Sequence, residues 1–174
     1  MTLPAQEALQ QIAKRRSLPR GALLLEEGEV SDKIFFVERG LVRAFYNEDS
    51  REITSWLSDE GQALCSLPCS FLGRPARETM QLLEPTTVLM LERADLEAVK
   101  RSYKSLADVE YRLMERYLLL FMARIRLLQI PKAKERQEVF SQEQSEFYRR
   151  VPLSYIATYL GIDPATLSRL RARF

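Results

Sequence analysis

The chain has 174 residues, which is room for one ordinary domain or for a medium domain and a small one. Its 46% hydrophobic and 29% charged residues, with a net charge of +2, indicate a soluble protein that folds. Histidine is absent and there are only two cysteines, which excludes His-based triads and disfavours zinc, haem and iron–sulfur sites, so we expect neither an enzyme nor a metal site.

The first half of the chain has the pattern of a β-rich domain. Short runs rich in β-forming residues are separated by glycine and acidic turns, and this spacing predicts an antiparallel barrel or sandwich. Residues 5–16 are predicted as a leading helix, ended by Pro19 and Gly21. The predicted strands are residues 23–25, 34–37, 41–46, 53–57 and 86–91.

The hydrophobic period changes to that of a helix after residue 92. Residues 95–103 predict a short helix, and a long helix follows from an N-cap at Ser105 to Pro131. One apolar stripe on the long helix repeats every seven residues and is typical of a dimer seam. A second stripe runs through Tyr111, Met114, Leu118, Phe121, Ile125 and Leu128, so one stripe would meet a partner and the other would pack on the β-domain. We assign the dimer interface to Leu106, Val109, Leu113, Arg116, Leu120, Ala123 and Leu127, with a helix buried on two sides of a single chain as the alternative.

The tail beyond residue 130 carries the basic excess of the chain. Residues 131–174 hold eight basic and five acidic residues, a net charge of +3. Residues 132–140 are predicted as a short helix, and residues 141–150 as a polar connector.

Residues 152–171 have the spacing of a helix-turn-helix. Ile156 and Leu160 lie on one face of a first helix, Gly161 can end it, and Asp163 can cap a second helix. Arginines on the outer face of the second helix can bond a guanine edge or neutralise a phosphate. The alternative is a structural hairpin with a solvated basic face. The predicted DNA-contacting residues are Arg169, supported by Thr166 and Ser168, with Arg149, Arg150, Arg171 and Arg173 on phosphates.

Both halves together resemble the CRP/FNR family of bacterial transcription regulators. The resemblance is carried by Gly21, the Glu27-Gly28 turn, residues 32–37 and 40–43, and by residues 149–152, 156–157, 160–162 and 166–169. It implies an α+β fold with a jelly-roll-like antiparallel β-roll over residues 1–104, a dimerisation helix over 105–130 and a helix-turn-helix domain over 131–174. The sequence ends at Phe174, as in a short branch of the family.

The cyclic-nucleotide cassette of that family is altered here. Ser66 stands where the family has the glutamate that binds the ribose, and Arg77 lies one residue out of register with the phosphate-binding arginine. We therefore expect that cAMP is not the effector, and we expect no cofactor. This segment would then either bind an unidentified small-molecule effector or be a vestigial turn that binds no ligand. We expect Cys65 and Cys69 to be buried small side chains. The candidate effector-pocket residues are Ser66, Ser70, Phe71, Arg77 and Thr79.

These observations predict a homodimeric, sequence-specific regulator of transcription with double-stranded DNA as its partner. The resemblance adds RNA polymerase as a further partner. No apolar run approaches the roughly 20 residues of a membrane span, and no signal peptide is visible, so we expect a cytoplasmic protein that does not enter a membrane. The alternative function is a β-roll sensor that acts through protein contacts and carries a degenerate helix-turn-helix.

Overall fold

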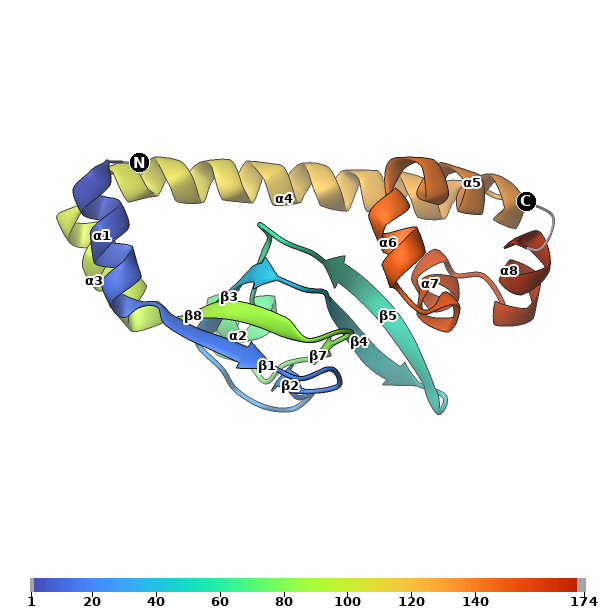
Figure 1. Ribbon diagram of the computed structural model, residues 1–174, viewed down its shortest axis with the longest axis horizontal. Helices are drawn as coiled ribbons and strands as arrows, with labels where there is room; N and C mark the ends of the chain where they lie inside the picture. Colours follow the sequence, from blue (N-terminus) through green and yellow to red (C-terminus); the bar gives the residue numbers. More distant parts are fainter. Residues whose placement is uncertain (1, 172–174) are drawn as a thin grey trace.

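A computed structural model describes residues 2–171 (Figure 1). Helix α1 (Leu3–Ile12) leads into the β-roll, and α3 (Arg93–Ser102) packs beside it after the last strand. The long helix α4 (Ser105–Gln129) runs along one side of the roll, and four short helices follow at its far end. These are α5 (Ala133–Glu143), α6 (Ser145–Arg150), α7 (Leu153–Leu160) and α8 (Pro164–Arg171).

The β-roll consists of two four-stranded antiparallel sheets. One sheet has the order β1-β8-β3-β6 and the other β2-β7-β4-β5. This architecture confirms the predicted α+β class with an antiparallel roll. The strands are β1 (Lys14–Leu18), β2 (Leu23–Leu25), β3 (Lys33–Arg39), β4 (Val42–Glu48), β5 (Arg51–Ser58), β6 (Ala63–Leu64), β7 (Thr79–Leu82) and β8 (Thr86–Glu92), with the short helix α2 (Leu67–Leu72) between β6 and β7.

Three strands, β1, β6 and β7, were not predicted from the sequence, each for a physical reason. Strand β1 was predicted as the end of the leading helix, but it pairs with β8 at the edge of its sheet. Its Lys-Arg-Arg run is mostly exposed, and charged residues on an edge strand discourage pairing with another chain. Strands β6 and β7 have two and four residues, too few to show a period.

The interior of the roll is filled by side chains that alternate inward from the two sheets. Val42 and Ala44 of β4 and Met80 and Leu82 of β7 are buried there beside Val37 of β3. The period of two along each strand places every second side chain inside. The opposite faces of β4, β5 and β7 are therefore free to contact the C-terminal helices.

The C-terminal half departs from the sequence prediction between residues 141 and 150, whereas the helix predicted over residues 132–140 corresponds to α5. The predicted connector over residues 141–150 is instead the end of α5 and all of α6. Phe147 of α6 and Phe140 of α5 are buried side chains within a polar stretch. One aromatic side chain every seven residues is enough to anchor these short helices but gives a weak periodic signal.

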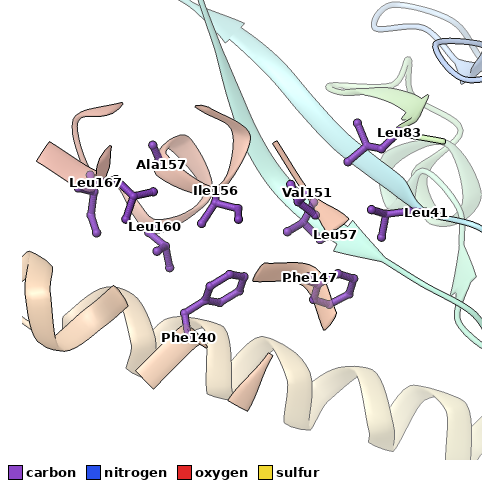
Figure 2. Packing of buried hydrophobic residues seen from close by; sticks show 11 residues of the cluster. Leu41, Leu57, Leu83, Phe140, Phe147, Val151, Ile156, Ala157, Leu160 and Leu167 are labelled. Atoms are coloured by element: carbon purple, nitrogen blue, oxygen red, sulfur yellow. The ribbon is translucent and has the colours of Figure 1, made fainter. Parts of the chain in front are cut away.

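A second hydrophobic core joins the roll to the C-terminal helices. Figure 2 shows Leu41 and Leu83 of the roll at one end of this core, Leu57 of the roll beside Val151 and Phe147, and Leu160 and Leu167 at the other end. The helices contribute Phe140, Phe147, Val151, Ile156, Ala157, Leu160, Ile162 and Leu167. No helix in residues 2–171 is long and apolar enough to cross a membrane.

Candidate functional site

Helices α7 and α8 are joined by a turn, and local sequence specifies both the end of α7 and the start of α8. Gly161 has φ of 60°, a left-handed conformation that glycine adopts without strain. Its N–H donates to the carbonyl of Thr158, and the N–H of Ile162 donates to the carbonyl of Ala157, which is the Schellman ending of a helix. Asp163 then caps α8 by accepting a hydrogen bond from the N–H of Thr166, with 3.1 Å between Oδ1 and N.

The outer face of α8 carries the side chains predicted to read DNA. Ser168, Arg169 and Arg171 are exposed, whereas Thr166 is half-buried. Arg169 lies along the helix, where its Nε donates to the carbonyl of Ala165 at 3.3 Å and its Nη2 to the hydroxyl of Thr166 at 3.1 Å. The guanidinium of Arg171 lies 5.5 Å from the ring of Tyr148. Arg173 lies outside the described residues.

The two adjacent arginines of α6 have different surroundings. Arg149 is exposed and pairs with Glu146 of its own helix. Arg150 instead turns toward the roll, where its guanidinium bonds the carboxylates of Glu60 and Glu84. These carboxylates raise the pKa of Arg150 above its usual range, and the guanidinium lowers the pKa of Glu60 to about 2. Arg150 is therefore held by carboxylates of the roll and is not a free phosphate ligand, whereas the phosphate contact of Arg149, which is exposed beside Glu146, stays a prediction.

The predicted effector-pocket residues do not all face one cavity. Ser66 is 2% exposed and Thr79 is buried, with Ser70 half-buried, but Phe71 and Arg77 both point to solvent. The buried neighbour of Arg77 is Ala76, so an alanine occupies the inward position beside β7. The guanidinium of Arg93 lies 5.4 Å from the ring of Phe71 on this outer surface. The structure thus separates two of the five candidates from the roll interior.

The inward side of the roll at this place presents an acidic group. Glu78 accepts a hydrogen bond from the hydroxyl of Ser55 at 2.8 Å, and the hydroxyl oxygen of Ser66 is buried with no partner in the described part of the chain. Cys69 is buried, as predicted, whereas Cys65 is half-buried, and desolvation raises the pKa of the Cys65 thiol, which disfavours a reactive thiolate.

The residues of the predicted seam on α4 lie on two different sides of the helix. Leu106 is 4% exposed, and Leu113, Leu120 and Leu127 are half-buried on the side that faces the same chain. Tyr117 on that side donates a hydrogen bond to the carbonyl of Ala63. Val109, Arg116 and Ala123 are exposed on a third side of the helix. The predicted seam is therefore not one outward apolar face. That face consists of Tyr111, Met114, Leu118, Phe121, Ile125 and Leu128, each at least 40% exposed; we call it the outward stripe.

Arg43 is a structural contact that the sequence prediction did not include as a site residue. It is 1% exposed, and its guanidinium lies 4.0 Å from the ring of Phe45 and 3.6 Å from the ring of Tyr155 in α7. Its Nε and Nη2 donate to the side chain of Gln81 at 3.0 and 2.7 Å, and Nη2 also reaches Glu52 at 2.5 Å. The sequence signal was a lone arginine inside an apolar strand.

Comparisons with known proteins agree with this architecture. Residues 15–103, just over half of the chain, match the family described as the cyclic nucleotide-binding domain. No curated protein matches the chain by sequence.

Three solved structures show the likeness over nearly the whole chain. The c-di-GMP responsive global regulator CLP of Xanthomonas campestris has a TM-score of 0.79 at 14% identity, covering 99% of this chain and 91% of its own. FixK2 of Bradyrhizobium japonicum has a TM-score of 0.75 at 21% identity, covering 93% and 84%. A transcriptional regulator of the CRP/FNR family from Eubacterium rectale has a TM-score of 0.75 at 14% identity, covering 100% and 83%. The chain therefore belongs to the cyclic nucleotide-binding domain family and has the CRP/FNR regulator architecture that its sequence resembles.

Proposed function

We propose that this protein is a homodimeric transcription regulator that reads a pseudo-palindromic DNA site with α8. The observation that carries the proposal is the complete helix-turn-helix. Its turn and cap are satisfied by Gly161 and Asp163, its core side chains are buried, and its outer face exposes Ser168, Arg169 and Arg171. Serine and arginine side chains on the exposed face of a recognition helix can contact base edges and phosphates in the major groove.

The outward stripe of α4 is the surface that we propose for the second copy. Its six residues follow alternating spacings of three and four, which is the repeat of a coiled-coil seam. Exposed apolar patches of this extent on a soluble chain are typical of interaction sites. A two-fold axis along α4 would pair the same residues from both copies and would place the two α8 helices on successive major grooves, about 34 Å apart. Contact with RNA polymerase stays a prediction from the resemblance.

We further propose that cAMP does not gate this regulator. The inward position beside β7 is occupied by Ala76, Arg77 points to solvent, and the carboxylate of Glu78 lies where it would repel a phosphate. A buried group without its hydrogen-bond partner costs ligand affinity, so a nucleotide phosphate here would lose its main anchor. The neighbour CLP is described as responsive to c-di-GMP, so proteins of this architecture are not tied to a single effector.

The test is selection of DNA from a random duplex library by the purified full chain. We expect enrichment of two half-sites related by a pseudo-two-fold axis, with centres about 10 base pairs apart. Arg77→Ala is the matched control for arginine substitutions in α8, because Arg77 is also exposed but lies on the roll. Absence of any enriched site, together with retained folding, would favour the alternative of a β-roll module that acts through protein contacts.

A further inference from the structure

The position of α8 relative to the roll depends on contacts that α6 and α7 make with the roll. The core that Figure 2 shows is shared, because Leu41, Leu57 and Leu83 come from the roll and the remaining members come from α5 to α8. Ile156, which belongs to the first helix of the helix-turn-helix, is fully buried in this core. The apolar contact alone would allow small sliding motions, since hydrophobic attraction has no preferred direction.

Directional contacts around this core remove that freedom. Arg150 is held by two carboxylates from two different loops of the roll. Its Nη1 and Nη2 each lie 2.9 Å from an oxygen of Glu60, and Nη2 lies 2.5 Å from Oε1 of Glu84. Oε1 of Glu60, which accepts from Nη2 of Arg150, also accepts the N–H of Gly40 at 2.7 Å. The backbone of the roll therefore helps to orient this carboxylate toward Arg150. Paired bonds between a guanidinium and a carboxylate fix both distance and angle.

A second set of contacts holds α7 on the adjacent sheet. The buried Arg43 stacks on Tyr155, and the hydroxyl of Thr158 accepts the backbone N–H of Thr54 at 3.2 Å and donates to the hydroxyl of Thr54 at 3.1 Å. Tyr155 and Thr158 are one turn apart on α7, so this helix contacts the strands at two heights. The two sets of contacts lie on different helices, α6 and α7, and together they restrain both translation and rotation.

We propose that Arg150 is a positioning residue, which holds the helix-turn-helix in one orientation on the β-roll and thereby sets how α8 meets DNA. The proposal rests on the proposed function for its DNA readout, but the docking itself is independent of DNA. It assigns Arg150 a role different from that of Arg149, although the two are neighbours in sequence. Within residues 2–171, Arg149 pairs with Glu146 of its own helix, and it is the matched control.

The first experiment measures docking without DNA, by hydrogen–deuterium exchange of the full chain. Arg150→Gln should speed exchange in β5, α6 and α7 on the order of tenfold, because charge-assisted bonds across the contact are lost and local opening becomes easier. Arg149→Gln should leave these segments unchanged. The double variant Glu60→Gln with Glu84→Gln should reproduce the effect of Arg150→Gln without altering any residue of the helical half. Equal exchange in wild type and Arg150→Gln would overturn the proposal.

The second experiment uses the selected DNA site and measures how affinity depends on salt. Loss of a phosphate contact lowers the slope of log K against log salt concentration by about 0.9, whereas loss of a positioning contact leaves the slope unchanged. We expect Arg150→Gln to weaken specific binding on the order of tenfold with an unchanged slope. The Glu60/Glu84 double variant should do the same. A slope reduced by about one in Arg150→Gln, with normal exchange, would instead make Arg150 a phosphate ligand. If wild type binds no DNA, the proposed function fails, while the exchange result still decides the docking role.

Discussion

Arg169 lies on the exposed side of α8 in a position to exchange its present partners for a base edge. Its bonds to the Ala165 carbonyl and the Thr166 hydroxyl are local and exposed, so breaking them costs little. We expect Arg169→Ala to weaken binding to the selected site by about 1–3 kcal/mol, roughly 5- to 150-fold in Kd, and to relax specificity at one base position. Fluorescence anisotropy on the selected site and on single-base variants measures both effects. An equal loss on random DNA would make Arg169 a phosphate contact.

The residues around the altered cyclic-nucleotide cassette support a second prediction. Ala76 is buried, Arg77 is exposed and Glu78 is bonded to Ser55, so the arginine of this segment is turned away from the interior of the roll. Calorimetric titration of the full chain with cAMP should give no saturable heat at cAMP concentrations up to about 100 μM. A site that lacks its charged partner binds too weakly to be filled in this range. Saturable binding near micromolar cAMP would show that another group replaces the arginine.

Individual residues show what a linear pattern can and cannot predict. Gly161 and Asp163 were predicted correctly because turn and cap chemistry is local, and the structure confirms both. The different roles of Arg149 and Arg150 were not predictable, because the partners of Arg150 lie 90 and 66 residues away in sequence. The outward direction of Arg77 depends on the backbone path before β7, which one residue of register changes.

At the scale of elements, α4 also has features that the sequence predicts and features that it does not. Its existence and length were predicted from its period, and the structure gives Ser105–Gln129. The sequence contained both apolar stripes but not which of them faces the roll, since an apolar heptad is equally suited to either contact. In the structure Tyr117 marks the side that faces the roll, because its hydroxyl donates to the carbonyl of Ala63 and its ring lies 6.5 Å from that of Trp56 in β5. Phe121, at the edge of the outward stripe, lies 4.7 Å from Trp56, so this edge of the stripe also contacts the roll.

The direction of the outward stripe leads to a prediction about oligomerisation. Ile125→Asp places a charge in the proposed seam of both copies, so the penalty counts twice, and the dimer should weaken by at least about 100-fold. Ala123→Asp is the matched control, because it introduces the same exposed charge two residues away, on a different side of the helix. Sedimentation velocity across a concentration series measures the dissociation constant. If Ala123→Asp loses the dimer and Ile125→Asp keeps it, the dimer interface is the heptad stripe predicted from the sequence and not the outward stripe.

At the scale of the whole molecule, the predicted boundary near residue 131 coincides with the end of α4 but not with a break in packing. Buried side chains from before and after this boundary share one core, with Leu57 of β5 and Leu160 of α7 among them. Sequence periodicity finds the individual elements, whereas the contact between the roll and the helices depends on side chains far apart in the sequence, such as Leu57 and Leu160. The division into an effector domain, a dimerisation helix and a DNA-binding domain therefore stays a functional prediction.

The ionic contact between the two halves predicts how the molecule responds to acid. The pKa of Glu60 is lowered from 4.5 to about 2, chiefly by its hydrogen bonds from Arg150. A carboxylate with a lowered folded-state pKa adds stability that is complete above the unfolded pKa and is lost as pH falls toward the folded value. Stability from this contact should thus be full above about pH 4.5 and should disappear toward pH 2.

The variant Glu60→Gln separates the contribution of the Glu60 carboxylate to stability from the contributions of the charged groups around it. Arg150 stays charged throughout this range, Glu84 shares its guanidinium, and the pKa of Asp59 is raised by burial, so Asp59 acts in the opposite direction. Urea unfolding followed by the fluorescence of Trp56, the only tryptophan, measures stability at about pH 7, 4.5 and 3. Wild type should lose more stability than Glu60→Gln between about pH 4.5 and 3, because only the wild type has this carboxylate to protonate. Parallel losses in the two proteins would mean that the Arg150–Glu60 contact does not hold the two halves together in solution.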